Sequence, residues 1–209
     1  HIGSAGTSPQ LCEIGMEGKG NIIHSITNGT AGNGNFGSAV YIQRARFCVV
    51  RGNIIGTNRE TNQALPIYNT GVFIESTDTE FELNYVGGSM PGQGNIIVAC
   101  GVAGVVVLNG EGFIRQNFIG VTDEQATNQF PNGEGVFSAT DIQIGGGGSL
   151  DGNYIGYNLT NGIRVDGGEN NEIDQNHCFN NANFGIVLVA CLNMNVKRNI
   201  CFENDFGIG

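Results

Sequence analysis

The sequence predicts an all-β solenoid of about seven coils, each built from three short strands. A phrase in which Asn precedes a short apolar strand occurs seven times. A second phrase, Gly-aliphatic-x-apolar, occurs between its copies. Towards the end of the chain the spacing becomes regular, because Asn153, Asn176 and Asn199 are 23 residues apart. Self-similarity at a period in the twenties is typical of coiled repeat architectures.

The repeated Asn is predicted to occupy a sharp bend between two strands of each coil. Asn tolerates left-handed backbone angles, and its side-chain amide can bond to the backbone of a turn. When coils stack, identical Asn side chains come into register and can form a ladder of amide hydrogen bonds. We therefore assign a structural role, rather than ligand binding, to seven residues: Asn21, Asn53, Asn95, Asn117, Asn153, Asn176 and Asn199.

Three strands per coil follow from the residues that flank the Asn. A segment of the form Val/Ile-x-x precedes it, as at Val50 and Ile114, and the Gly-aliphatic phrase follows, as at 71–74 and 185–188. Alternation within a short strand places one face inward and the other outward. Each coil climbs one strand spacing, about 4.8 Å, so the coils together predict a rod on the order of 30 Å long. The consensus of leucine-rich repeats, which share this period, is absent.

Two kinds of insertion lengthen the earlier coils. Segments 56–71 and 120–135 each carry a Pro followed by an Asn, so we interpret them as two copies of one loop. Gly-rich segments before the ladder Asn recur at 15–20, 87–94 and 145–152. The two kinds alternate from coil to coil, which predicts a superperiod of two coils through the first two-thirds of the chain.

These phrases resemble those of the right-handed parallel β-helix repeat proteins, the pectate-lyase-like superfamily. The nearest likeness is to large secreted bacterial surface proteins with alternating IGG…GN-I and N-IGT…PN-GV coils, and it covers nearly the whole chain. The resemblance implies a right-handed parallel β-helix in which the Gly-aliphatic strand is first in the coil and the strand after the Asn is third. It also implies that the Pro-containing loops connect third strands to first strands, and that the protein is extracellular or at a cell surface.

The composition fits one β domain. Gly is abundant, at 35 residues, and weakens helix interiors, while 40% hydrophobic residues support a packed core. The net charge of −10 argues against nucleic acid as a partner, because phosphates would be repelled. No run approaches the roughly 20 apolar residues that span a bilayer, so we expect no membrane insertion. We predict a single domain over residues 1–209 with an irregular segment at 1–10, and interpret His1 as a processed terminus or the edge of an excised segment.

Six cysteines are present without a CxxC pair, and their spacing matches no metal site. Cys178 and Cys201 occupy the same position in successive coils, two residues after a ladder Asn. Two interpretations are open for this pair. It can form a small apolar ladder, since thiols are often buried, or a disulfide, since the strand spacing of about 5 Å permits one.

The outer face of the first strand is where enzymes of the resembling family usually act, with clustered carboxylates beside Arg, Lys or His. Here its outward positions are largely apolar or aromatic, and its only carboxylates are Glu75 and Asp166. They are expected about three coils apart, roughly 14 Å, which is too far for a glycosidase pair. Arg164 beside Asp166 is typical of a surface ion pair. We therefore assign no catalytic residue and expect no cofactor and no metal.

Other polar residues give few further candidates. Asp123 and Glu134 lie near opposite ends of one Pro-containing loop and are candidate Ca²⁺ ligands, although no Asp-rich spacing supports a site. His177 stands alone in the sequence, without a nucleophile or metal-binding partner. Asn28 and Asn158 begin N-glycosylation sequons, which matter only in a secreted and glycosylated chain.

Tyr41, Phe73 and Phe137 form a predicted contact stripe on the outer face of the first strand. Three interpretations are open. The chain's own Pro-containing loops can cover the stripe. Another chain can pack against it, because large exposed apolar patches usually mark contacts. Sugar rings can also stack on it, which makes a glycan a candidate partner.

The last residues, 206–209, lie inside a Gly-aliphatic phrase, and neither terminus shows a capping helix. Two explanations compete: the sequence is a slice of a longer β-helix, or subunits stack head to tail through heterologous contacts. Our functional hypothesis is a non-enzymatic extracellular structural protein, a subunit of a fibre, filament or surface stalk that self-associates head to tail. The alternative is a protein that binds or degrades polysaccharide as a lyase, hydrolase or epimerase, which the resemblance alone implies.

Overall fold

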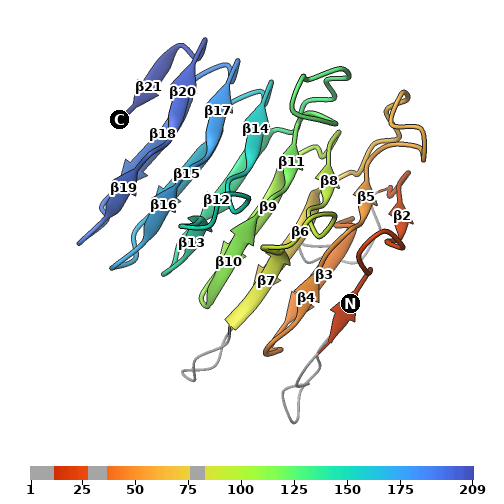
Figure 1. Ribbon diagram of the computed structural model, residues 1–209, viewed down its shortest axis with the longest axis horizontal. Helices are drawn as coiled ribbons and strands as arrows, with labels where there is room; N and C mark the ends of the chain where they lie inside the picture. Colours follow the sequence, from red (N-terminus) through yellow and green to blue (C-terminus); the bar gives the residue numbers. More distant parts are fainter. Residues whose placement is uncertain (1–11, 28–36, 76–82) are drawn as a thin grey trace.

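The computed structural model describes residues 12–27, 37–75 and 83–209, which form three parallel sheets of seven strands each. Every coil contributes one strand to each sheet, so that strands three apart in the chain lie side by side (Figure 1). The described residues contain no helix. The fold is therefore a parallel β-helix of about seven coils, and the predicted fold class is confirmed.

Each coil passes through the second, the third and then the first sheet. The first sheet holds the Gly-aliphatic strands β3 (Val40–Gln43), β6 (Thr70–Glu75), β9 (Ala103–Leu108), β12 (Glu134–Ser138), β15 (Ile163–Asp166), β18 (Phe184–Val189) and β21 (Phe206–Ile208). The second sheet holds β1 (Glu13–Ile14), β4 (Val49–Val50), β7 (Leu83–Gly87), β10 (Glu111–Arg115), β13 (Gln143–Gly145), β16 (Glu172–Asp174) and β19 (Asn195–Lys197). The third sheet holds β2 (Ile22–Ile23), β5 (Ile54–Ile55), β8 (Ile96–Ile97), β11 (Phe118–Ile119), β14 (Tyr154–Gly156), β17 (His177–Phe179) and β20 (Ile200–Phe202).

The core lies between the three sheets and consists of aliphatic columns along the coil axis. In the third sheet, one inward side chain per coil stacks in register: Ile23, Ile55, Ile97, Ile119, Ile155, Cys178 and Cys201. Those from Ile55 to Cys178 are fully buried. Burying one such aliphatic side chain contributes about 1.5–3 kcal/mol. Strands of only two or three residues are therefore stabilised by stacking between coils.

The predicted Asn ladder is present at the bend between the second and third sheets. At each step the Nδ2 atom of one Asn donates to Oδ1 of the next at 2.8–3.0 Å, from Asn21 through Asn53, Asn95, Asn117, Asn153 and Asn176 to Asn199. The backbone N–H of each donating Asn also points to the same oxygen. Asn117 Nδ2 additionally donates to the carbonyls of Val86 and Arg115 at 2.9 Å. The ladder thus satisfies backbone groups that the bend withdraws from the sheets.

A second Asn ladder, absent from the sequence-based prediction, follows the third sheet. It runs from Asn132 through Asn158 and Asn181 to Asn204, with Nδ2-to-Oδ1 distances of 3.0, 2.9 and 2.9 Å. It occupies the turn that leads to the first sheet in the last four coils. The sequence contains a pattern that predicts this ladder, because Asn158, Asn181 and Asn204 are also 23 residues apart.

The two kinds of insertion lie at different bends. The loops that contain Pro66 and Pro131 connect the third sheet to the first, as the resemblance implies, and Gly-rich loops connect β7 to β8 and β13 to β14. Gly56 begins the first Pro-containing loop with a φ of 84°, and a Cβ atom there would lie 1.7 Å from the carbonyl oxygen of Val98. Only Gly fits this position, which explains why Gly follows the apolar pair in the repeated phrase.

Cys178 and Cys201 are register partners on β17 and β20. Both are reduced in this structure, as are the other cysteines, so the apolar-ladder interpretation describes their contacts. A hydrogen bond with Cys201, and then burial, raise the pKa of the Cys178 thiol well above its usual range. Cys178 therefore continues the aliphatic column of the third sheet in its protonated form, while the same hydrogen bond lowers the pKa of the partly buried Cys201 thiol.

We predict that Asn117→Ala destabilises the fold by on the order of 3 kcal/mol, because it removes the partner of the buried Asn95 N–H and the side-chain donor to the Val86 carbonyl. The measurement is the urea midpoint of unfolding. Asn195→Ala is the control, since Asn195 is exposed on β19, and its effect should stay within about 0.5 kcal/mol. Equal midpoints for the two variants would contradict a stabilising role for the ladder.

Candidate functional site

The predicted contact stripe is brought together on the outer face of the first sheet. Tyr41 meets Phe73 edge-on, with ring centroids 5.4 Å apart. Phe73 is only 6% exposed and packs with Ala103 and Val106, and Phe137 lies against the same cluster. The stripe is thus a small apolar cluster of its own. Contact with another chain or with sugar rings stays a prediction.

The two carboxylates of this face are each held by a neighbouring side chain. Tyr41 Oη donates to Glu75 Oε2 at 2.5 Å. Arg164 binds Asp166 in a fork, with Nε–Oδ1 at 2.8 Å and Nη2–Oδ2 at 2.6 Å. The strands that carry Glu75 and Asp166, β6 and β15, are separated by β9 and β12. The structure therefore does not bring the two carboxylates together.

Glu134 joins this face, which the sequence analysis missed because it placed the residue in a loop. It begins β12, and Asn161 Nδ2 donates to its Oε1 at 2.7 Å. Burial raises the pKa of the Glu134 carboxyl, although Asn161 and Arg164 act in the opposite sense. A cavity of about 410 Å³ lies beside Glu134 and is lined by Phe73, Phe137 and others.

Asp123, the second candidate Ca²⁺ ligand of the sequence analysis, instead accepts hydrogen bonds from the backbone N–H groups of its own loop.

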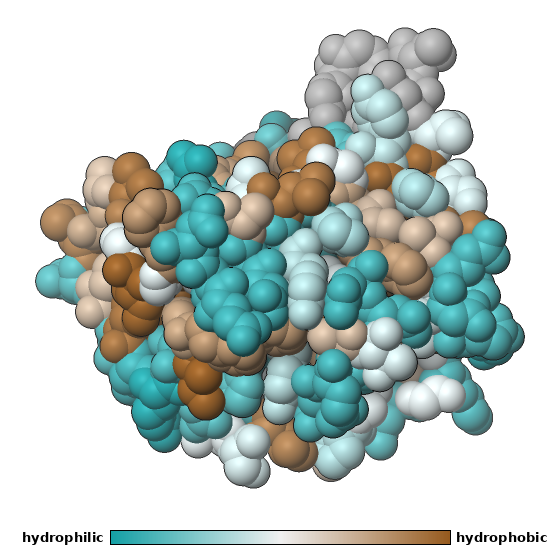
Figure 2. Space-filling view, turned by 90° about the horizontal axis from the view of Figure 1, so that it is seen from above, coloured by the Kyte–Doolittle hydropathy of each residue, from teal (hydrophilic) through white to brown (hydrophobic). Residues whose placement is uncertain are grey.

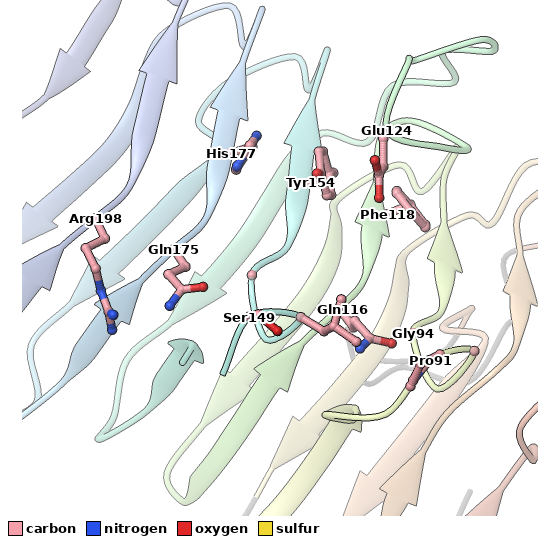
Figure 3. Close-up of a pocket in the computed structure, with 13 residues that line it drawn as sticks. Pro91, Gly94, Gln116, Phe118, Glu124, Ser149, Tyr154, Gln175, His177 and Arg198 are labelled. Atoms are coloured by element: carbon pink, nitrogen blue, oxygen red, sulfur yellow. The ribbon is translucent and has the colours of Figure 1, made fainter. Parts of the chain in front are cut away.

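A larger groove of about 480 Å³ lies on the outer face of the third sheet (Figure 3). Its aromatic row consists of Phe118, Tyr154 and His177, which are register partners on β11, β14 and β17. Their ring centroids are 5.5 and 4.7 Å apart. Each of the three directly follows a ladder Asn, so the ladder fixes their alignment. The sequence carried this signal, but His177 was read as isolated.

A polar row runs parallel to the aromatic row along the bend (Figure 3). It contains the residues that directly precede a ladder Asn, namely Gln116, Gln175 and Arg198. Their φ angles are 63°, 61° and 54°, in the left-handed region that Gly52 also adopts at this position, whereas Gly20, Gly94 and Gly152 do not adopt it. Gly52 and other Gly residues hold this position elsewhere in the chain. Where a side chain replaces the Gly, it projects beside the third sheet.

Two kinds of loop contribute the remaining lining of the groove. Pro91 and Ser149 belong to the Gly-rich loops, and Glu124 belongs to the second Pro-containing loop. In Figure 3 the Glu124 side chain lies between Phe118 and Tyr154. Burial, and then the charge of Glu124, raise the pKa of the Tyr154 hydroxyl. The guanidinium of Arg198 donates a hydrogen bond to the carboxylate of Asp174 and forms an ion pair with it, and the Asp174 side chain is fully buried.

Several polar groups of this groove make no hydrogen bond within the described part of the chain. They are the carboxylate of Glu124, the hydroxyls of Ser149 and Tyr154, the side-chain amide of Gln175 and the Nε2 atom of Gln116. The carboxylates of the first sheet, by contrast, are all occupied by protein partners. The groove therefore offers a ligand more unoccupied polar groups than the outer face of the first sheet does.

The two glycosylation sequons have different outcomes. Asn158 is 1% exposed, and its Nδ2 atom donates to Asn181 in the second ladder. A glycan on that nitrogen is incompatible with this fold, because it would remove a rung and need space that the core occupies. Asn28 lies outside the described residues.

Comparison with protein-family models, with curated proteins and with solved structures gives no match. The fold assignment therefore rests on the coordinates and the repeat, and membership of the pectate-lyase-like superfamily remains a proposal. Across residues 12–27, 37–75 and 83–209, no helix is long and apolar enough to cross a membrane. In the same residues, no cluster of three or more His, Cys, Asp or Glu side chains is arranged to hold a metal ion.

We predict opposite pH dependences for two carboxyl variants. The pKa of Glu134 is raised in the fold, so the wild-type chain loses stability as pH rises above 4.5, the ordinary value, and Glu134→Gln should escape this loss. The hydrogen bond from Lys197 lowers the pKa of Glu172, so that Glu172 stabilises the fold above its ordinary pKa and Glu172→Gln should lose this contribution. The measurement is the urea midpoint at about pH 4 and about pH 7. If both variants shift in the same direction, the assignment of Glu134 is wrong.

Proposed function

We propose that the protein is a non-enzymatic extracellular structural protein whose β-helices associate head to tail into a fibre or stalk. The observation that carries the proposal is the apolar surface of β19, β20 and β21, each of which pairs with a strand on one side only among residues 12–27, 37–75 and 83–209. Five apolar side chains there are 43–58% exposed: Leu192, Ile200, Phe202, Phe206 and Ile208. Figure 2 shows hydrophobic residues gathered at this end, on the left. An apolar surface with unpaired strand edges favours addition of another parallel coil.

Two aromatic stacks end at this edge, so that the last ring of each is exposed to any coil that is added. Phe202 stacks on Phe179 with centroids 5.2 Å apart and 7° between the rings. Phe206 stacks on Phe184 at 4.8 Å. The outward faces of Phe202 and Phe206 would be covered by aromatic or aliphatic side chains of an added coil. Such stacking contributes about 0.5–1.5 kcal/mol per pair beyond the buried area.

The Asn ladder also has a direction that suits head-to-tail contact. Every donor points from one coil to the Oδ1 atom of the following coil. At one end, Oδ1 of Asn21 accepts no bond within the described residues, and at the other end the backbone N–H of Asn199 has no partner there. An unused acceptor at one end and an unused donor at the other are complementary. A second copy placed end to end would continue the ladder, as a heterologous contact requires.

Degradation of polysaccharide is the second candidate, and one observation favours it. The Glu134 carboxyl, with its raised pKa, lies in the field of Arg164 and Asp166 beside the cavity of the first sheet. A carboxyl that retains its proton is the group that a general acid requires. Turnover of an acidic glycan that is lost in Glu134→Gln would support this function over a purely structural one.

We predict that the chain forms elongated particles whose length grows with concentration, visible by electron microscopy and analytical ultracentrifugation. Phe206→Asp should weaken association by at least about tenfold, because it buries a charge in the contact. Leu159→Asp is the matched control: Leu159 is 64% exposed, but it lies in the turn between β14 and β15, away from the edge. A strictly monomeric wild-type protein would falsify the proposal. Equal disruption by the two substitutions would show that the edge is not the contact.

A further inference from the structure

We propose that Cys178 and Cys201 form a redox-active pair, in which Cys201 reacts with a low-molecular-weight disulfide and Cys178 then closes a disulfide between two neighbouring coils. The two residues are register partners on β17 and β20, which lie side by side (Figure 1). Neighbouring strands are about 4.8 Å apart, and disulfides join Cα atoms that are roughly 4.4–6.8 Å apart. The strand spacing therefore permits the bond without a change of register.

The column that contains the two thiols shows that packing alone does not explain them. Before the two Cys, every coil contributes an Ile to this column of the third sheet: Ile23, Ile55, Ile97, Ile119 and Ile155. An Ile side chain buries more apolar surface than a Cys side chain, so Ile would stabilise the column more. The change to Cys occurs in two successive coils, which is the arrangement that a bond between thiols requires.

The two thiols are not equivalent, and their difference assigns their roles. Cys178 is fully buried, whereas Cys201 is partly exposed. The hydrogen bond between them raises the pKa of Cys178 and lowers the pKa of Cys201, so that a thiolate forms on Cys201 while Cys178 keeps its proton. The thiolate is the form of cysteine that attacks a disulfide. Cys201 is therefore the thiol that reacts first.

The surroundings of Cys201 leave one side open to a reagent. β20 pairs with β17 on one side, and no strand within residues 12–27, 37–75 and 83–209 pairs with its other side. Exchange proceeds through a mixed disulfide, in which the attacking and the leaving sulfur lie on opposite sides of the central sulfur. Cys178 lies on the β17 side of Cys201, so the reagent sulfur would occupy the open side. The buried thiol is therefore placed to displace it.

The reaction balances with glutathione disulfide as the oxidant. The Cys201 thiolate attacks one sulfur of the reagent, forms a mixed disulfide and releases a glutathione thiolate, which takes up the proton that Cys201 had lost. The Cys178 sulfur then attacks Cys201 Sγ and breaks its bond to glutathione, while the Cys178 proton passes to the second departing thiolate. The two protein thiols together lose two electrons, and the reagent is reduced to two molecules of glutathione.

The disulfide would restrain the coil that has the fewest buried side chains. Most residues of β19, β20 and β21 are exposed. The two Cys are 23 positions apart, and closing a loop between them removes conformations that the coil can adopt when it opens. Oxidation is therefore expected to slow local opening of this coil. The reaction takes place within one chain, so it does not depend on head-to-tail association.

The test is equilibration of the dilute purified chain with mixtures of glutathione and glutathione disulfide. We expect a product that has lost two hydrogen atoms in mass, whose disulfide maps to Cys178 and Cys201 after digestion, and that excess dithiothreitol returns to the starting mass. Amide hydrogen exchange in β20 should be slower by about tenfold in this product. Sedimentation of the same samples reports association separately, so failure of this proposal and failure of head-to-tail assembly are distinguishable.

Two variants separate the roles of the pair. Cys178→Ala keeps the reactive thiol but not its partner, so it should accumulate a mixed disulfide with glutathione on Cys201. Cys201→Ala should leave the buried Cys178 unmodified. Cys191→Ala is the matched control: Cys191 is also partly exposed, but its thiol donates to the backbone carbonyls of Val165 and Gly167. This variant should form the disulfide as wild type does.

Three results would overturn the proposal. The wild-type chain forms no disulfide between Cys178 and Cys201 at any ratio of the two reagents, the disulfide maps to another pair of cysteines instead, or Cys178 carries the mixed disulfide in Cys201→Ala. None of these results requires Cys178→Ala to fold. Cys201 is only partly buried, so the fold tolerates its replacement by Ala.

Discussion

The structure depends on one constraint: a coil that turns sharply inside a stack must still satisfy the backbone groups at the turn. The Asn ladder meets this constraint, because each side chain accepts from the backbone N–H of one coil and donates to carbonyl oxygens and to the next Asn. The ladder works only when every Asn is in register. That requirement fixes the register of the neighbouring positions too, so the aliphatic columns inside and the aromatic row outside are consequences of the same alignment.

The coils, the three strands per coil and the first ladder could be predicted because they recur in the sequence at recognisable intervals. The candidate sites could not, because they depend on the path of insertions that break the interval. Ladder residues Asn53 and Asn95 are 42 positions apart, whereas Asn95 and Asn117 are 22 apart. Glu124 comes from such an insertion, and no local pattern indicates where its side chain lies.

A short motif and the repeat can predict different roles for the same residue, and the repeat predicts the role correctly where the residue is buried. Asn158 begins a sequon, yet it is a rung of the second ladder and has almost no exposed surface. Glu134 was assigned to a loop, yet it pairs with Ala103 in the first sheet and is held by Asn161. In both cases the deciding partner lies in a neighbouring coil, more than 20 positions away in the sequence, where a motif of a few residues carries no information.

The outward side chains that are paired within the fold and those that are free to bind a ligand lie on different sheets. The first sheet carries Glu75 and Asp166, but Tyr41 and Arg164 already occupy these carboxylates, and a ligand would have to displace those partners. Displacement costs the hydrogen bonds that are lost, about 1.5–3 kcal/mol for each one to a charged group. A ligand in the third-sheet groove would meet side chains of Glu124 and Gln175 that give up only water. For equal contacts the groove is therefore the more favourable binding surface, and the coil alignment that creates it already exists to satisfy the backbone.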